Sequence, residues 1–305
     1  MSLASHDEEF AALPNGLRIC YSSHGRTDAP AILLIVGLGL QLVYWPAVLI
    51  NQLVAGGYRV VCFDNRDSGR SDRLATPHPN KWQQLTGKAP AGAYGLEDMA
   101  EDSALLLDHL GIEGAHLVGM SMGGMIAQTL SYRHPRLALS LVSIFSTSGN
   151  RKVGQPALSM LWQMGRAKAP RTEAEAVESF RKTMTHIGDP TVPGIEQLWD
   201  SYATQAWQRN GARADARAMF RQVGAILKSA DRTQHLKTIQ APSLVVHGDV
   251  DRMVNPTGGS ATAQAIPGAT YTVIPGMRHQ IDAVQAERLA TLILAHIEKV
   301  PGQKK

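Results

Sequence analysis

The chain has 305 residues, of which 44% are hydrophobic and 18% charged, so it is long and apolar enough to bury a sizeable core. Its formal net charge is +4, but the 30 Lys and Arg residues are scattered, which argues against a nucleic-acid partner. No run approaches membrane-spanning length, and the start lacks a basic region followed by a long apolar stretch. We therefore expect no membrane partner and, by default, a cytoplasmic location.

The predicted strands are short, apolar and rich in β-branched residues. The turn signal Asn15-Gly16 separates Phe10–Leu13 from Leu17–Tyr21 and indicates an opening antiparallel hairpin. The later strands are expected at Ala31–Val36, Tyr58–Phe63, Ala115–Val118, Leu139–Phe145, Ser243–Val246 and Thr270–Ile274. Because these runs show little polar alternation, both faces of the sheet should be covered, as in a parallel sheet between helices.

Predicted helices alternate with these strands. Apolar residues at three- and four-residue spacing indicate helices at Trp45–Ala55, Leu96–Leu110, Met122–His134 and Ala283–Lys299. Alternating strands and helices predict right-handed crossovers and an α/β, doubly wound fold. Cys20 and Cys62 each lie inside a strand-like segment, which favours buried thiols over a disulfide or a zinc site.

The alternation stops between residues 151 and 240. This segment has helical propensity and is too long for a plain crossover, so we expect a helical cap inserted into a core formed by residues 1–150 and 241–305. The large apolar side chains of the cap should mostly form its own core, and a minority should line a substrate pocket. They are Met160, Trp162, Met164, Trp199, Tyr202, Trp207, Met219 and Phe220.

The candidate nucleophile is Ser121, in Gly119-Met120-Ser121-Met122-Gly123, at the corner between a predicted strand and a predicted helix. A nucleophile elbow needs small residues two positions before and after the serine, because neighbouring backbone crowds this strained turn. A serine hydroxyl also needs a histidine base and an acid that orients it. In a doubly wound sheet, such groups gather after the carboxyl ends of strands.

Two later loops supply these groups. The loop after Ser243–Val246 contains Asp249 and Asp251, and the loop after Thr270–Ile274 contains His279. The position of His279 distinguishes it from His116 and His247, which lie at or within strands and are expected to be core histidines. Tetrahedral intermediates also need two hydrogen-bond donors, and the backbone N–H after the nucleophile, that of Met122, is one candidate.

The order serine, acid, histidine and the motifs around them resemble the α/β-hydrolase superfamily over essentially the whole chain. The resemblance implies that Asp251, three residues after Gly248, is the acid instead of Asp249. It implies that the backbone N–H of Leu38 is the second oxyanion donor. The family commonly has glycine immediately before its histidine, whereas this chain has Arg278.

The stretch Asp64–Ser71 resembles the family's Asp-x-Arg-Gly-x-Gly-x-Ser sequence, and we interpret it as scaffold. Together with Ser-Met-Gly-Gly, it looks like aclacinomycin methylesterase and related bacterial carboxylesterases. The expected function is therefore hydrolysis of a small carboxylic ester through an acyl-enzyme, without metal or cofactor, by a monomer or homodimer. The alternatives are C–C bond hydrolysis, lactone opening or cofactor-free perhydrolysis on the same residues, or a non-catalytic ligand receptor.

Overall fold

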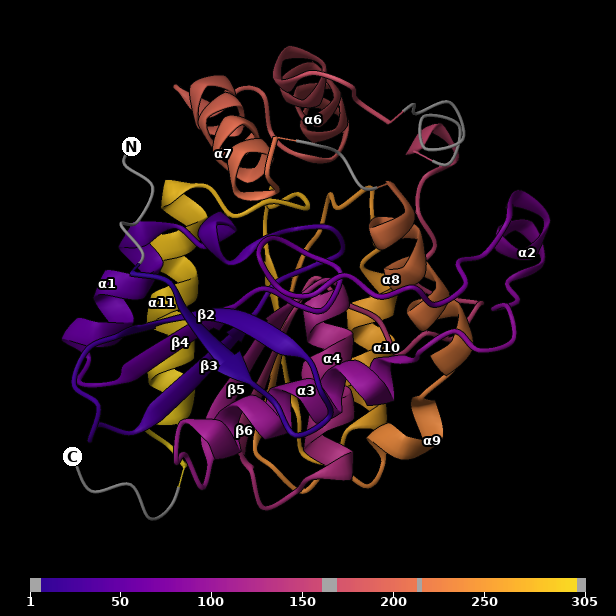
Figure 1. Ribbon diagram of the computed structural model, residues 1–305. Helices are drawn as coiled ribbons and strands as arrows, with labels where there is room; N and C mark the ends of the chain where they lie inside the picture. The colour runs from indigo at the N-terminus through magenta and orange to yellow at the C-terminus, as the bar shows by residue number, and fades with distance from the viewer. Residues whose placement is uncertain (1–6, 161–168, 213–215, 301–305) are drawn as a thin grey trace.

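A computed structural model describes residues 7–160, 169–212 and 216–300 and contains an eight-stranded sheet (Figure 1). The strands are β1 (Glu9–Ala12), β2 (Arg18–His24), β3 (Ala31–Ile35), β4 (Arg59–Phe63), β5 (Ala115–Met120), β6 (Ala138–Ile144), β7 (Ser243–Gly248) and β8 (Thr270–Ile274). They lie in the order β1-β2-β4-β3-β5-β6-β7-β8.

The sheet is mostly parallel, as the sequence predicts. β1 and β2 form the expected antiparallel hairpin, and β2 pairs antiparallel with β4. Every other neighbouring pair, from β4 across to β8, is parallel. The predicted α/β fold with a doubly wound sheet is confirmed. Because β3 and β5 are adjacent although they are not consecutive in the chain, the loops after them meet at one point of the sheet edge.

Helices cover both faces of this sheet. The helices of the described residues are α1 (Ala47–Ala55), α2 (Lys81–Thr86), α3 (Leu96–His109), α4 (Met122–Arg133), α6 (Glu173–Ile187), α7 (Ile195–Arg209), α8 (Ala216–Ser229), α9 (Thr233–Leu236), α10 (Thr257–Ala265) and α11 (Ala283–Ile297), with a 3₁₀ turn at Leu42–Tyr44. α1 and α11 pack together on one face, and α3 and α4 pack together on the other (Figure 1).

Side-chain alternation along the buried strands divides the core between these two layers. In β3, Ile32 and Leu34 join the cluster formed with α1 and α11, whereas Leu33 and Ile35 join the cluster formed with α3 and α4. All four side chains are fully buried, which explains why the strand reads as an uninterrupted apolar run. Both cysteines are buried free thiols, as expected.

Within the described residues, the helices α6 to α9 lie between β6 and β7, where the sequence predicts the inserted cap. α6 and α7 pack against each other above the body of the molecule, whereas α8 runs down its side and contacts α3 (Figure 1). Met160 and Trp199 are buried in a small cluster with side chains of α6. Tyr202 and Trp207 are buried, Met219 is exposed, and Trp162 and Met164 lie outside the described residues.

No helix in the described part of the chain is both long and apolar enough to span a membrane.

Candidate active site

Ser121 occupies the sharp turn between β5 and α4. Its φ of 55° and ψ of −123° lie outside the regions that a non-glycine residue ordinarily adopts. Such a conformation costs about 1–3 kcal/mol and persists only where the surroundings enforce it. The backbone N–H of Ser121 donates to the carbonyl of Ile144 at 2.9 Å, and Ser146 Oγ donates to the carbonyl of Ser121 at 2.7 Å. The neighbouring strand β6 and the residues just after it therefore hold the turn.

The glycines around the serine are required by close backbone contacts. A Cβ atom at Gly119 would lie 2.1 Å from the carbonyl oxygen of Gly123, and one at Gly123 would lie 2.0 Å from the carbonyl oxygen of Ile35. Real Cβ atoms do not approach an oxygen this closely. The small residues that the sequence interpretation requires are therefore present for a steric reason, since α4 starts directly against β3.

His279 lies in the loop between β8 and α11 and joins the serine to an acid. Its Nε2 is 3.0 Å from Ser121 Oγ, and its Nδ1 is 2.7 Å from Asp251 Oδ2. Its ring also packs against the ring of Phe145, with 4.4 Å between the centroids. The structure thus brings together Ser121, Asp251 and His279. Along the chain, His279 is 158 residues from Ser121 and 28 residues from Asp251.

Asp251 is buried, with several donors directed at its carboxylate. Backbone N–H groups of Met253 and Val254 donate to Oδ1 at 2.8 and 3.0 Å, and His247 Nε2 lies 3.4 Å from Oδ2. Burial alone would raise the pKa of Asp251. The charge of His279 and hydrogen bonds from His247, His279 and the Val254 N–H outweigh burial and hold this pKa well below its ordinary value. The carboxylate is therefore ionised at neutral pH.

Asp249, the other acid in this loop, has a different partner. Its Oδ1 accepts a hydrogen bond from the backbone N–H of Gly276 at 2.7 Å, in an exposed position. This contact ties the loop after β7 to the loop after β8. His279 Nδ1 instead contacts Asp251, so the geometry favours Asp251 as the residue that orients the histidine.

The predicted oxyanion donors flank the serine. A Cβ at Gly37 would lie 3.2 Å from Ser121 Cβ, so the loop after β3 that contains Leu38 lies directly beside the serine. Met122 is the first residue of α4, and the Ser121 side chain does not cap that helix. First-turn N–H groups of a helix have no intrahelical acceptor, and the helix dipole makes this position favourable for negative charge.

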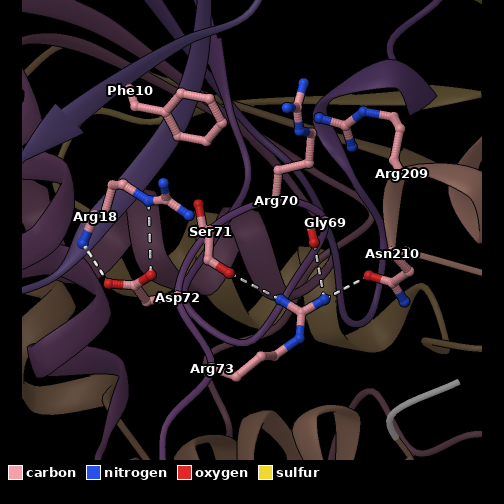
Figure 2. A pocket seen from close by; sticks show the side chains of 10 residues that line it. Phe10, Arg18, Gly69, Arg70, Ser71, Asp72, Arg73, Arg209 and Asn210 are labelled. Carbon is pink, nitrogen blue, oxygen red and sulfur yellow. Dashed lines mark hydrogen bonds and ion pairs between the residues drawn. The ribbon is translucent and has the colours of Figure 1, made fainter. Parts of the chain in front are cut away.

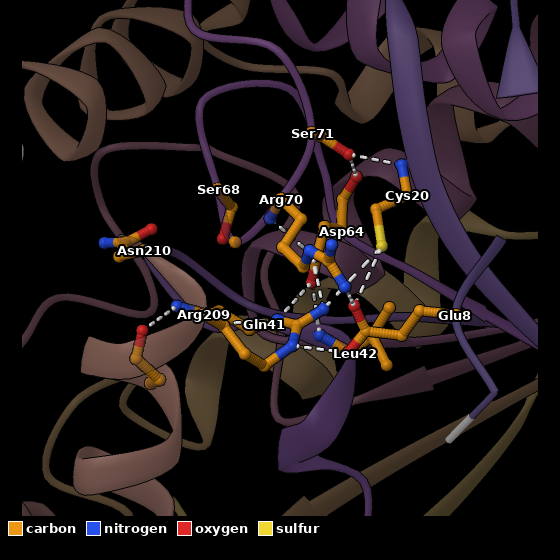
Figure 3. Close-up of polar contacts among 12 residues, drawn as sticks. Glu8, Cys20, Gln41, Leu42, Asp64, Ser68, Arg70, Ser71, Arg209 and Asn210 are labelled. Carbon is orange, nitrogen blue, oxygen red and sulfur yellow. Dashed lines mark hydrogen bonds and ion pairs between the residues drawn. The ribbon is translucent and has the colours of Figure 1, made fainter. Parts of the chain in front are cut away.

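Buried polar contacts hold the loop after β4 against the loop after β3. Asp64 is fully buried, and its carboxylate accepts the N–H groups of Leu42 and Arg70 at 2.7 and 2.8 Å (Figure 3). Arg209, at the end of α7, forms a buried ion pair with Asp64 at 2.8 Å and also donates to Gln41. These contacts fit the interpretation of Asp64–Ser71 as scaffold, and they tie α7 to it.

A cavity of about 420 Å³ lies on the outer side of this scaffold (Figure 2). Its lining is Phe10, Arg18, Gly69, Arg70, Ser71, Asp72, Arg73, Arg209, Asn210 and Gly211. The lining includes neither Ser121 nor His279. Arginines of the lining have partners within the protein, such as Asp72 for Arg18 and Asn210 for Arg73. We therefore interpret the cavity as a surface hollow whose side chains hold one another in place.

The loop that carries His279 also contacts the inserted helices. The backbone N–H of His279 donates to the carbonyl of Ile187 at 3.0 Å, and Arg278 Nη1 donates to the carbonyl of Gly188 at 2.9 Å. Both acceptors lie at the carboxyl end of α6. In the loop that carries Asp251, Met253 packs against the cluster of Met160, Met184, Ile187, Ile195 and Trp199. The inserted segment therefore touches both loops that complete the site.

Sequence reasoning missed several of these contacts. His247 is a buried strand residue, as expected, but its Nε2 also lies near Asp251 while it donates to the carbonyl of Val254 at 2.9 Å. Its spacing of four residues from Asp251, across a turn, was the available signal. The contacts of Phe145, Ile187 and Gly188 with the His279 loop have no comparable signal in one sequence.

Within the described residues, no group of three or more His, Cys, Asp or Glu side chains could hold a metal ion.

A family model described as the α/β hydrolase fold matches residues 30–281. The chain belongs to this family. Rhodomycin D methylesterase of Streptomyces peucetius is 27% identical to it over 290 residues, covering 88% of this chain and 91% of the relative. A bifunctional esterase/perhydrolase of Acinetobacter calcoaceticus is 24% identical over 302 residues, covering 94% and 99%.

A solved enol-lactonase from Burkholderia xenovorans superposes with a TM-score of 0.72 at 22% identity, covering 95% of this chain and 100% of that one. At this identity, the likeness shows the fold. Family membership and the relatives together identify the chain as an enzyme of the hydrolase class.

Proposed function

We propose that this hydrolase cleaves carboxylic esters through an acyl-enzyme formed on Ser121. The observation that carries the proposal is the continuous set of contacts from Ser121 Oγ through both nitrogens of His279 to Asp251. Because the Asp251 carboxylate can only accept, His279 Nδ1 carries a proton and Nε2 is free to accept the serine proton. That tautomer is the one in which histidine acts as a general base.

The reaction follows from this arrangement. His279 removes the proton of Ser121 as Oγ attacks the ester carbonyl, and the N–H groups of Leu38 and Met122 stabilise the oxyanion, each by about 3 kcal/mol. His279 then protonates the leaving alcohol, and water releases the acid by the same route. Asp251 stabilises the imidazolium that forms in both steps. No step requires a metal or cofactor, and the substrate is a small-molecule ester.

We also propose that residues 151–240 act as a lid whose α6 end adjoins the site. The support is the pair of hydrogen bonds from His279 and Arg278 to the end of α6. A lid in this position would shape the acyl or alcohol pocket and limit the access of water to the acyl-enzyme. A cytoplasmic location and a monomeric or homodimeric state stay predictions.

The first test replaces the nucleophile. Ser121→Ala should lower turnover of p-nitrophenyl acetate by at least about 10⁴-fold, because the covalent route is lost. Ser131→Ala is the matched control, because Ser131 is a buried serine of α4 whose hydroxyl donates to the carbonyl of Ala127 within that helix. Unchanged turnover by Ser121→Ala would overturn the mechanism.

A fluorophosphonate probe separates the enzyme from a receptor. We expect covalent labelling of the wild-type protein at Ser121 and none of Ser121→Ala. Absence of labelling in a folded wild-type protein that still binds esters would instead favour a non-catalytic receptor.

Perhydrolysis is a second candidate activity, because one relative is named as both an esterase and a perhydrolase. In that reaction hydrogen peroxide replaces water in the attack on the acyl-enzyme and releases a peroxyacid. Peroxyacid formation from an ester and hydrogen peroxide, absent in Ser121→Ala, would establish it. Hydrolysis of the ester without formation of peroxyacid would exclude perhydrolysis and leave ester hydrolysis as the activity.

A further inference from the structure

The segment between β4 and α3 projects from the body of the molecule at α2, beside α8 (Figure 1). This short helix has no buried residue. It is formed by its own caps: Asn80 and Gln83 make a reciprocal capping box at its start, and Gly87, in a left-handed conformation, ends it. With no residue buried, this helix leaves the side chains of Lys81, Trp82 and Leu85 exposed.

Two of those side chains are large and apolar. Trp82 is 72% exposed and Leu85 is 82% exposed. Because they are three residues apart on a helix, they lie on the same face. Single exposed apolar residues are common on protein surfaces. Here an exposed tryptophan and an exposed leucine lie together on a projecting helix, so its tip forms a small apolar patch.

Cations surround this tip. Lys81 and Lys88 are exposed at the two ends of α2. Arg151 donates to the carbonyls of Thr86 and Gly87 at 3.3 and 2.6 Å, which places the exposed pair Arg151-Lys152 against the end of the helix. We call the set of Lys81, Trp82, Leu85, Lys88, Arg151 and Lys152 the α2 patch.

Carboxylates are missing from the sequence on both sides of the α2 patch. Neither residues 74–96 nor residues 146–172 contain an Asp or Glu. At the average density of 26 in 305 residues, stretches of this combined length would carry about four. The cations of the α2 patch are therefore not neutralised by acids from their own segments.

The helix α8 connects the α2 patch to the loop beside Ser121. The ring of His78 lies 6.1 Å from the ring of Phe220, and Gly224 packs against Pro79. The neighbouring residue Met219 is 40% exposed and lies against Gly39, in the predicted oxyanion loop. The helix α8 thus contacts both the projecting segment and the loop beside Ser121.

We propose that the α2 patch docks the enzyme onto an anionic lipid surface. A tryptophan and an aliphatic side chain can insert at the boundary between lipid headgroups and acyl chains. Lysine and arginine side chains around them can then contact anionic headgroups. A second protein fits less well, because two apolar side chains fall far short of the roughly 1,000 Å² that a stable protein interface buries.

Docking at this surface needs no membrane-spanning segment. It revises the expectation that the chain has no membrane partner, which rested on the lack of a long apolar run. A lipid surface at the α2 patch would lie beside α8, the helix whose Met219 lies against Gly39, so apolar esters dissolved in lipid would be presented near the site. The inference concerns binding and does not depend on the proposed ester chemistry.

Co-sedimentation with vesicles tests the inference. The wild-type protein should bind vesicles of phosphatidylcholine that contain phosphatidylglycerol, and bind phosphatidylcholine alone more weakly. Trp82→Ser with Leu85→Ser should lower the partition coefficient at least about tenfold, because both apolar anchors are lost. Lys81→Glu with Lys88→Glu should weaken binding only to the anionic vesicles, and added salt should do the same.

The matched control is Val284→Ser, which removes an exposed apolar side chain from the start of α11 and should leave vesicle binding unchanged. All variants should hydrolyse or bind soluble ligands as the wild type does, which shows that they are folded. The inference is overturned if the wild-type protein does not bind the anionic vesicles, or if the double serine variant binds them equally. A wild-type dimer that this variant converts to monomer would also overturn it, by assigning the face to a second copy.

Discussion

The two halves of the candidate site are held by different parts of the molecule. Ser121 is fixed by core backbone, through its N–H bond to Ile144 and the contact of Gly123 with Ile35. His279 is fixed partly by the inserted segment, through its N–H bond to Ile187. The position of the proposed nucleophile is therefore a property of the sheet, whereas the position of the proposed base also depends on α6.

This difference predicts unequal responses to substitution. Changes in the nucleophile half should act through chemistry or through global stability, because nothing there can move independently of the core. Changes at the contact with α6 should act on substrate binding and leave the fold intact. The predictions below run from the largest expected effect to the smallest.

Asp251→Asn should give the largest effect among these variants. It leaves the size of the side chain unchanged but removes the charge that stabilises imidazolium and allows the wrong tautomer of His279, which should lower kcat about 10⁴-fold. Asp249→Asn is the matched control two residues earlier, and it should retain activity within a few-fold because Asp249 only accepts the N–H of Gly276. Steady-state kinetics on p-nitrophenyl acetate measures both, and equal losses would contradict the assignment of the acid.

Gly123→Ala should destabilise the whole fold. The new Cβ would lie 2.0 Å from the Ile35 carbonyl, so β3 and α4 must separate, at a cost of about 3 kcal/mol or more in the free energy of unfolding. Gly16→Ala serves as the control, since its φ of 85° brings backbone strain without any atom within 4 Å. It should cost only about 1–2 kcal/mol. Guanidinium unfolding compares the two, and equal costs would reject the steric argument.

Acidification should destabilise the wild-type protein through Asp251. Because the folded-state pKa of Asp251 is depressed, its contribution to stability is fully present above the unfolded pKa near 3.8 and is lost as pH falls through the lower folded pKa. In unfolding measurements from about pH 5 to about pH 2, the range in which this contribution starts to be lost, Asp251→Asn should show a shallower decline than the wild type. Parallel declines would mean that other carboxylates set the acid limit.

The sequence was sufficient for the features that depend on local pattern. Apolar runs without alternation predicted the parallel strands, and glycines around Ser121 predicted the elbow, because both are steric requirements expressed within a few residues. His279 could be chosen because it follows a strand, where the fold gathers reactive groups. The same rule left Asp249 and Asp251 as candidates for the acid, and only the resemblance to the family selected Asp251.

Features that depend on packing between distant segments could not be predicted. Helical propensity indicated an inserted helical segment, but it did not show that α8 lies against α3 while α6 reaches the loop of His279. The contact of His247 with Asp251 depends on how the loop after β7 turns back. Such contacts are decided by tertiary packing, which leaves little trace in composition or spacing.

Arg278→Ala should have the smallest effect, confined to substrate binding. Its hydrogen bond to the Gly188 carbonyl is partly solvent-exposed, so its loss should cost about 1 kcal/mol, or about fivefold in KM for bulky esters. The main-chain bond from His279 to Ile187 remains, so kcat should change little. Because p-nitrophenyl acetate is small, its KM should be nearly unaffected by a looser α6.

The matched controls for Arg278 separate a positioning role from a general loss of charge. Arg278→Lys keeps the charge and one donor and should restore part of the affinity, whereas Arg288→Ala, on the exposed side of α11, should change neither constant. Relatives with glycine before the histidine lack this side chain, so the arginine is a contact that this chain adds between its base loop and α6. A fall in kcat as large as the rise in KM would show that the contact instead holds His279 in its reactive position.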